Sequence, residues 1–225
     1  LFRSIGIFVR YIPLPSSVIA LTRGLIGTAF LAVVILKKGP GISWGAIKRN
    51  LLNLCLSGAF IGINWILLFE SYHYTTVATA TLCYYMAPVF VTIAAPFVFK
   101  ERLTKKKIFC ITGALVGMVL ISGIWNTGIS GTGELWGILY GIGAAVFYAS
   151  VILLNKKIQG ISAYDKTMMQ LAASSIVLLP YTVLTEKVSV LSLTPMAVIL
   201  LAVVGILHTG ISYTLYFGSM KNLEA

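Results

Sequence analysis

Acidic residues are scarce in this sequence, and charge of either sign is low. The 225 residues include six Asp and Glu against 17 Lys and Arg, and only 10% are charged, whereas soluble domains carry about 25%. Hydrophobic residues make up 58%, and the mean hydropathy is +0.95. Because the apolar residues extend along the whole chain, the composition excludes a soluble domain with a single anchor and predicts a multi-pass membrane protein.

Motifs for catalysis, metal binding and disulfide formation are also lacking. Cys55, Cys83 and Cys110 lie in apolar runs without CxxC spacing, so they are interpreted as small packing residues. No hydrolase elbow, phosphate loop, zinc motif or catalytic carboxylate pair occurs. We therefore expect no cofactor, no metal and no catalytic residue. The net charge of +11 does not predict a nucleic-acid partner, because the basic residues stand in short loops between apolar runs.

What the sequence does contain is a series of apolar runs of membrane-spanning length. Two runs of about 20 residues flank the basic loop 100–107, and each can cross a hydrocarbon core of ~30 Å as a helix. The expected helices are 16–36, 50–71, 76–99, 108–124, 134–154, 164–184 and 195–220, after a shorter one at 1–12. The predicted fold class is an all-α polytopic membrane protein with a partial first helix and seven full helices.

The basic residues gather in alternate loops. Since successive spans reverse direction, one set of loops holds 13 Lys and Arg and the other holds two. The positive-inside rule places the basic set in the cytoplasm, namely loops 37–49, 100–107 and 156–166, and the Gly-rich linker 126–133 outside. This predicts a multi-pass protein of the cell (inner) membrane.

The sequence is weakly similar to itself. A shift of about 148 residues aligns the third helix with the eighth, and a shift of 146–147 aligns the second with the seventh, which sets Arg23 on Met169 or Gln170. The first shift pairs Gly62 with Gly210 and Asn64 with Ser212. Because the first unit would hold five helices, a second copy enters from the opposite face. This predicts an inverted repeat, 1–125 and 134–225, with a midplane site between the halves.

Several features together resemble a known family. The fourth helix contains Pro88 and is followed by Phe-Lys-Glu-Arg-Leu at 99–103, and the fifth contains Gly113, Gly117 and Gly123. In these residues the chain resembles the EamA-type permeases of the drug/metabolite transporter superfamily. The resemblance covers the whole chain and implies ten helices in two inverted five-helix repeats. We therefore expect further apolar residues before residue 1 and two more helices after residue 225.

Polar and aromatic side chains inside the spans are the candidates for a substrate site, because such groups are costly in hydrocarbon and often functional. They recur at helical spacing in the third, fourth, sixth and eighth helices. The candidates are Asn64, Trp65, Thr81, Tyr85, Pro88, Tyr148, His208 and Ser212. One interpretation is a central cavity, half aromatic and half hydrogen-bonding. The alternative is that these groups make interhelical hydrogen bonds.

Three charged residues are further candidates. Arg3 and Arg23 lie inside spans, about 12–14 Å from their outer ends, where they could clamp a carboxylate. Arg3 stands where the family pattern has a small residue. Arg23 could instead pair with Glu70 or extend to the interface. Glu70 could couple transport to protons or act as an ion-pair partner at a gate.

Three small-residue motifs predict close packing of helices. They are Gly58xxxGly62, Gly113xxxGly117 and Gly137xxxGly141. Such spacing permits helices to cross closely within the chain, or a homodimer to form through the same faces.

Together these features predict a secondary transporter in the lipid bilayer that moves a small-molecule substrate by alternating access. The resemblance alone implies export of amino acids or related metabolites. One alternative is a membrane-embedded enzyme acting on lipid head groups, which would need clustered acidic and His side chains. His73, His208, Glu70 and Asp165 are instead scattered. The other alternative is a non-transporting membrane partner protein, which would favour a large soluble domain or tail.

Overall fold

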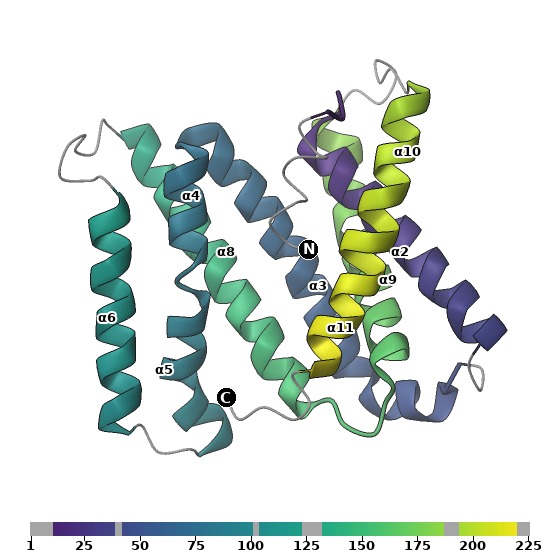
Figure 1. The fold of residues 1–225 in the computed structure, drawn as a ribbon, viewed down its shortest axis with the longest axis horizontal. Coiled ribbons are helices and arrows are strands. Elements are labelled where there is room, and N and C mark those ends of the chain that lie inside the picture. Colours follow the sequence, from purple (N-terminus) through teal and green to yellow (C-terminus); the bar gives the residue numbers. More distant parts are fainter. Residues whose placement is uncertain (1–10, 39–41, 101–103, 123–131, 187–193, 220–225) are drawn as a thin grey trace. The chain divides into compact units, whose positions relative to one another are not determined.

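The computed structural model describes residues 11–38, 42–100, 104–122, 132–186 and 194–219, and all regular elements in these ranges are helical (Figure 1). They are α2 (Ser16–Lys38), α3 (Trp44–Tyr74), α4 (Val77–Tyr84), α5 (Ala87–Phe99), α6 (Lys105–Ser122), α8 (Thr132–Lys157), α9 (Ala163–Thr185), α10 (Pro195–Val203), η3 (Val204–Ile211) and α11 (Ser212–Ser219). Six stretches are long and apolar enough to cross a membrane, counting 77–99 as one and 195–216 as another. The all-α multi-pass fold class is confirmed.

Some predicted boundaries are wrong. α3 begins at Trp44, so Lys48 and Arg49 are helical and not part of a loop 37–49. Lys and Arg are good helix formers whose long stems can lie along apolar surface, so a basic segment need not be a loop. Thr132 and Gly133, expected in the linker, open α8. Most of the expected first helix, Arg3 included, and the rest of the linker lie outside the described residues.

The expected fourth helix is interrupted near its middle. α4 ends at Tyr84 and α5 starts at Ala87, and the Met86 amide donates to the Cys83 carbonyl at 3.1 Å. Pro88 lies at the start of α5, where its missing N–H is tolerated but cannot continue the ladder of the preceding helix. The Thr92 hydroxyl donates to the Pro88 carbonyl at 2.8 Å. Pro88 therefore marks a break between two helices within one span.

The expected eighth helix is not a continuous α-helix. Between α10 and α11 the chain forms the π-helix η3, in which hydrogen bonds reach five residues back instead of four. Two hydroxyls do the same: Thr209 Oγ1 donates to the Val204 carbonyl at 3.0 Å, and Ser212 Oγ donates to the Leu207 carbonyl at 2.7 Å. A π-helix accommodates an additional residue in one turn, which a hydrophobicity pattern does not reveal.

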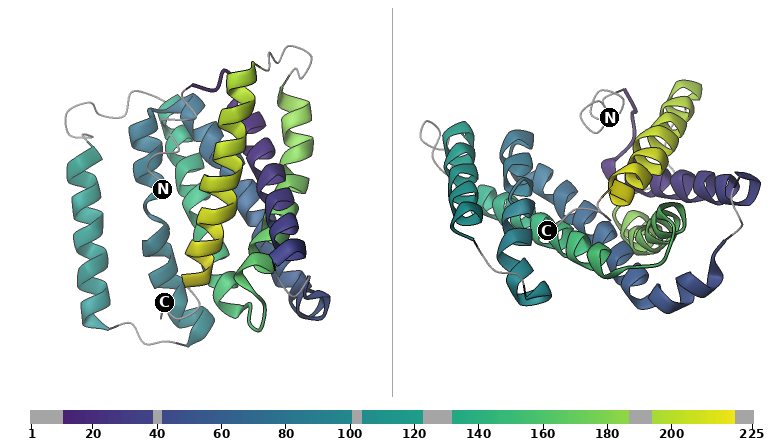
Figure 2. Two further views of the ribbon diagram at one scale, coloured as in Figure 1. Left: turned by 45° about the vertical axis from the view of Figure 1, so that its right-hand side comes forward. Right: turned by 60° about the horizontal axis from the view of Figure 1, so that its bottom comes forward.

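Contacts divide the chain into two compact units. The first comprises 1–63 and 154–224, and the second comprises essentially 64–153, so the division passes through α3 and α8. Within the first unit, α2 lies beside α9, η3 and α10, and α11 lies beside α9 (Figure 2). Its core includes Ile19, Leu201 and Val204. Within the second unit, α6 lies beside α4 and α5. This grouping describes packing and leaves the repeat boundaries at 125 and 134 as a prediction.

Candidate functional site

Gln170 is the centre of a buried hydrogen-bond network in the first unit. Its Nε2 donates to Ser57 Oγ on α3 at 2.6 Å and to Asn155 Oδ1 near the end of α8 at 2.9 Å. The three side chains are between 0 and 5% exposed. The network therefore ties α3, α8 and α9 together inside the protein.

Two amide atoms of this network keep spare hydrogen-bonding capacity. Within the described part of the chain, Gln170 Oε1 and Asn155 Nδ2 are buried without a hydrogen-bond partner. One is an acceptor and the other a donor, so the network does not use the full hydrogen-bonding capacity of its two amides. The sequence alone indicated Gln170 only as a possible alignment partner of Arg23. Its position as a polar residue well inside the span 164–184 is the feature that could have identified it as a candidate.

Helices α2 and α9 pack antiparallel at close range. Ser17 Oγ at the start of α2 donates to Glu186 Oε1 just after α9 at 2.7 Å. Further along α2, a Cβ built at Gly24 would lie 2.6 Å from Ser175 Oγ, and one at Gly27 would lie 3.0 Å from Leu171 Cδ1. The absence of side chains at these two glycines is what lets the helices approach so closely.

Two further helices use glycines in the same way. On α3, a Cβ at Gly58 would lie 2.5 Å from Ala173 Cβ, and one at Gly62 would lie 3.1 Å from Val177 Cβ. On η3, a Cβ at Gly205 would lie 2.6 Å from Ile26 Cβ, and one at Gly210 would lie 3.1 Å from Phe30 Cδ1. The predicted close packing through Gly58xxxGly62 is confirmed within the chain, with α9 as the partner.

The two candidates of the eighth helix lie in or beside the π-helical segment. His208 and Ser212 are both 3% exposed. The Ser212 hydroxyl donates a hydrogen bond to the Leu207 carbonyl. The Ser212 side chain thus bonds to the backbone of η3, which agrees with the alternative that polar side chains inside the spans make structural hydrogen bonds.

In the second unit, two polar side chains of α3 bind backbone carbonyls of α8. Asn64 Nδ2 donates to the Ala144 carbonyl at 2.6 Å, and Ser71 Oγ donates to the Gly137 carbonyl at 2.7 Å. A Cβ at Gly137 would lie 2.7 Å from Thr75 Cβ, and one at Gly141 would lie 2.8 Å from Cys83 Cβ. The close packing predicted for Gly137xxxGly141 is therefore present. The hydrogen bond to Ala144 favours a role for Asn64 in helix packing over a role in lining a substrate cavity.

Aromatic residues of α3 and α4 meet aromatic residues of α8 in the second unit. The rings of Tyr84 and Tyr148 are 5.4 Å apart between centroids, and those of Tyr74 and Tyr140 are 5.6 Å apart. Tyr85 lies at the break between α4 and α5 and is 60% exposed. Among the aromatic candidates, Tyr148 is thus engaged by a neighbouring ring, whereas most of the Tyr85 side chain is accessible.

The candidates are divided between the units. Arg23, His208 and Ser212 belong to the first unit, and Arg3 lies outside the described residues. The second unit holds Asn64, Trp65, Glu70, Thr81, Tyr85, Pro88 and Tyr148. Trp65 is 4% exposed, and Arg23, Glu70 and Thr81 are half-buried. A single cavity formed by all of them remains a prediction.

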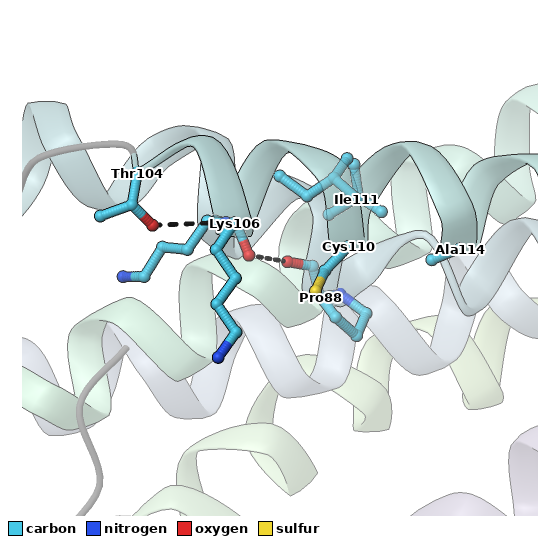
Figure 3. A pocket seen from close by; sticks show the side chains of 9 residues that line it. Pro88, Thr104, Lys106, Cys110, Ile111 and Ala114 are labelled. Atoms are coloured by element: carbon cyan, nitrogen blue, oxygen red, sulfur yellow. Dashed lines mark hydrogen bonds between the residues drawn. The ribbon is translucent and has the colours of Figure 1, made fainter.

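A cavity of about 500 Å³ lies in the second unit between α5 and α6 (Figure 3). Its lining consists of Pro88, Val89, Thr92, Thr104, Lys106, Lys107, Cys110, Ile111 and Ala114. Pro88 is the only one of the predicted substrate-site residues in this lining. Among the described residues, no three His, Cys, Asp or Glu side chains gather as a metal site would require.

Comparison with known proteins agrees with a multi-pass helical membrane protein. The EamA-like transporter family matches residues 4–123 and 135–225. A Bacillus subtilis (strain 168) protein named "Uncharacterized transporter YxxF" is 34% identical over 228 residues, covering all of this chain and 71% of the relative. The chain belongs to the EamA-like transporter family, and the family expected from the sequence is confirmed.

Two more distant relatives and a solved structure agree. Proteins named "Uncharacterized transporter" from Clostridium kluyveri and Archaeoglobus fulgidus are 28% and 31% identical over 68% and 64% of this chain. The matches span half the length of each of these two relatives. A crystal structure of a protein with 18% identity superposes with a TM-score of 0.76 over 98% of this chain and 75% of its own. That likeness shows the fold.

Proposed function

We propose that this protein is a secondary transporter that exports amino acids or related small metabolites by alternating access. Membership of a transporter family and the transporter names of the relatives support a permease. The resemblance noted in the sequence supports the substrate class and the direction. Alternating access follows if the two halves are inverted copies that rock about a site between them.

The observation that carries this proposal is a set of paired contacts in the first unit. A shift of 147 sets Ile26 on Ala173 and Phe30 on Val177, and a shift of 148 sets Gly62 on Gly210. The contact of Gly62 with Val177 therefore corresponds to the contact of Gly210 with Phe30. Contacts repeat in this way when two copies of one unit are related by a two-fold axis.

The contact between α2 and α9 follows the same rule. The shift of 147 sets Gly24 on Leu171 and Gly27 on Ser174. A Cβ built at Gly24 would lie 3.9 Å from Ser174 Oγ, and one built at Gly27 would lie 3.0 Å from Leu171 Cδ1, which is the equivalent pair. The Cβ at Gly24 would also lie 3.9 Å from the carbonyl oxygen of Leu171, the residue that the shift sets on Gly24. These contacts support a local two-fold axis that passes between α2 and α9, and the two segments matched by the family agree with two copies.

Within this proposal, Tyr85 is the strongest substrate-binding candidate of the second unit. It lies at a helix break, its ring is largely accessible, and it combines an apolar body with a hydroxyl, which suits an amphipathic substrate. His208 and Arg23 are the corresponding candidates of the first unit. Glu70 remains the proposed coupling or gate residue.

The test is substrate flux into proteoliposomes that contain the full-length protein, screened with a panel of amino acids and related metabolites. We expect at least one amino acid to be transported, and Tyr85→Leu to abolish its flux while expression and thermal stability stay near those of the wild type. Phe97→Leu is the matched control, because Phe97 is an exposed aromatic residue of the same span (83% exposed) and not a candidate. Absence of flux for the whole panel, or equal flux in both variants, would contradict the proposal.

A further inference from the structure

The cavity between α5 and α6 is elongated along α6. Its lining starts at Thr104, just before α6, and continues on α6 from Lys106 through Cys110 to Ala114, so this part of the lining extends about 12 Å along the helix. Half of a ~30 Å hydrocarbon core is about 15 Å. Figure 3 shows Thr104 and Lys106 at one end of the cavity and Ala114 at the other. If α6 spans the bilayer, as the sequence predicts, the cavity runs from its basic end toward the bilayer centre.

The two ends of the cavity differ in chemistry. Lys106 and Lys107 contribute two ammonium groups at the end nearest the loop 100–104. Deeper in, Pro88, Val89, Ile111 and Ala114 form an apolar wall. A ligand that fits both ends has an anionic head and an apolar body.

The hydroxyl groups that line the cavity already have partners in the chain. Thr92 Oγ1 donates to the Pro88 carbonyl at 2.8 Å, and Thr104 Oγ1 accepts from the Lys107 amide at 3.3 Å. Apart from these two hydroxyls and the two lysines, the side chains of the lining are apolar or thiol, so a polar metabolite would leave hydrogen-bonding groups unsatisfied in the deeper part of the cavity, which is costly. An acyl chain has no such groups, so this lining favours a lipid tail over a polar solute.

We propose that this cavity binds an anionic phospholipid, with the phosphate at Lys106 and Lys107 and one acyl chain along Cys110, Ile111 and Ala114. Basic pockets between transmembrane helices are known to hold anionic lipid head groups. The site is separate from the Gln170 network of the first unit, and Pro88 is the one substrate-site candidate that borders it.

The test compares lipid retention by the purified full-length protein in native mass spectrometry. Phosphatidylglycerol and phosphatidylcholine with identical acyl chains are added in separate samples. We expect preferential retention of phosphatidylglycerol by the wild type. The double variant Lys106→Gln/Lys107→Gln should weaken that retention by about fivefold for each lysine removed.

Three controls separate a lipid site from general charge. Lys156→Gln/Lys157→Gln removes another consecutive lysine pair at a helix end that does not line this cavity, and should leave retention near the wild-type level. Ala114→Trp, or Ala114→Leu if the larger change lowers folded yield, should reduce phosphatidylglycerol binding with both lysines intact, because the Ala114 side chain is exposed into the cavity. Inorganic phosphate at equal concentration should not displace the lipid.

Several results would overturn the proposal. An equal loss of phosphatidylglycerol retention in the two double-lysine variants would show non-specific charge attraction. Unchanged retention in both Ala114 variants would show that the cavity holds no acyl chain. Displacement by inorganic phosphate would identify a simple anion site. Displacement by a transported amino acid would assign the cavity to the transport path.

Discussion

Helices α9 and α2 each pack closely against a helix that presents glycines to them. The two glycine-bearing helices differ in type. On α9, the partner α3 presents Gly58 and Gly62, four residues apart on an α-helix. On α2, the partner η3 presents Gly205 and Gly210, five residues apart on a π-helix. A π-helix repeats its hydrogen bonds at five residues, so each pair of glycines stays on one face. The difference suggests that η3 absorbs one additional residue without turning the following helix away from α2.

The additional residue has a structural cost. In a π-helix the regular ladder of the α-helix is interrupted, and carbonyls accept from the amide five residues ahead, as the Leu207 carbonyl does from the Ser212 amide. Thr209 and Ser212 provide hydroxyls for the carbonyls of Val204 and Leu207. The same segment holds His208, which is buried and which the shift of 148 sets on the apolar Phe60 of α3. The two halves would thus share their packing but differ in polar chemistry at this position.

The largest effect is expected for Gly58→Ala. The new methyl would meet Ala173 Cβ at 2.5 Å and the backbone carbonyl of Gln170 at 2.6 Å, so α9 must shift to accept it. Overpacking of this kind costs about 3 kcal/mol, and the thermal midpoint in detergent should fall by many degrees. Gly113→Ala is the matched control from the other predicted glycine motif, because a Cβ there meets nothing within 4 Å in the described structure. Equal effects of the two changes would contradict the packing account.

A smaller loss is expected for Gln170→Leu, which removes the centre of the hydrogen-bond network of the first unit. Leucine removes the hydrogen bonds to Ser57 and Asn155 and leaves the Asn155 amide buried without a donor. An unsatisfied buried polar group costs about 2 kcal/mol. The thermal midpoint should fall, and replacing Asn155 by Leu in the same protein should recover part of the loss. A double variant that is no more stable than Gln170→Leu alone would contradict this coupling.

The smallest effect is expected for Asn64→Leu in the second unit. It removes one interhelical hydrogen bond, from Asn64 Nδ2 to the Ala144 carbonyl, and such bonds in membrane proteins contribute about 0.6 kcal/mol on average. A modest fall in thermal midpoint with substantial flux retained would support a packing role. Complete loss of flux at unchanged stability would instead restore Asn64 to the substrate site.

Much of this architecture could be predicted from hydrophobicity, because a span of about 20 apolar residues has few alternatives to a helix in lipid. The helical spans follow from that rule, and the close packing at two of the three glycine motifs follows from the spacing of small residues. The π-helix cannot be predicted in this way, because the mostly apolar sequence of Val204–Ile211 does not distinguish a π-helix from an α-helix. The extension of α3 over Lys48 and Arg49 does not follow either, because a basic segment between apolar runs favours a loop in a hydropathy pattern although Lys and Arg are good helix formers. Nor could the sequence show that Gln170 meets Ser57 and Asn155, which are 113 and 15 residues away along the chain.

A matched pair of single-residue deletions tests the central comparison most directly. Deleting Leu207, which is 44% exposed, would leave Gly205 and Gly210 four residues apart. Deleting Ala59 would leave Gly58 and Gly62 only three apart on α3. If η3 is an α-helix with one inserted residue, the Leu207 deletion should give monodisperse folded protein with nearly the wild-type thermal midpoint in fluorescence-detected size exclusion, and the Ala59 deletion should aggregate. Aggregation of the Leu207 deletion with a folded Ala59 deletion would contradict the account.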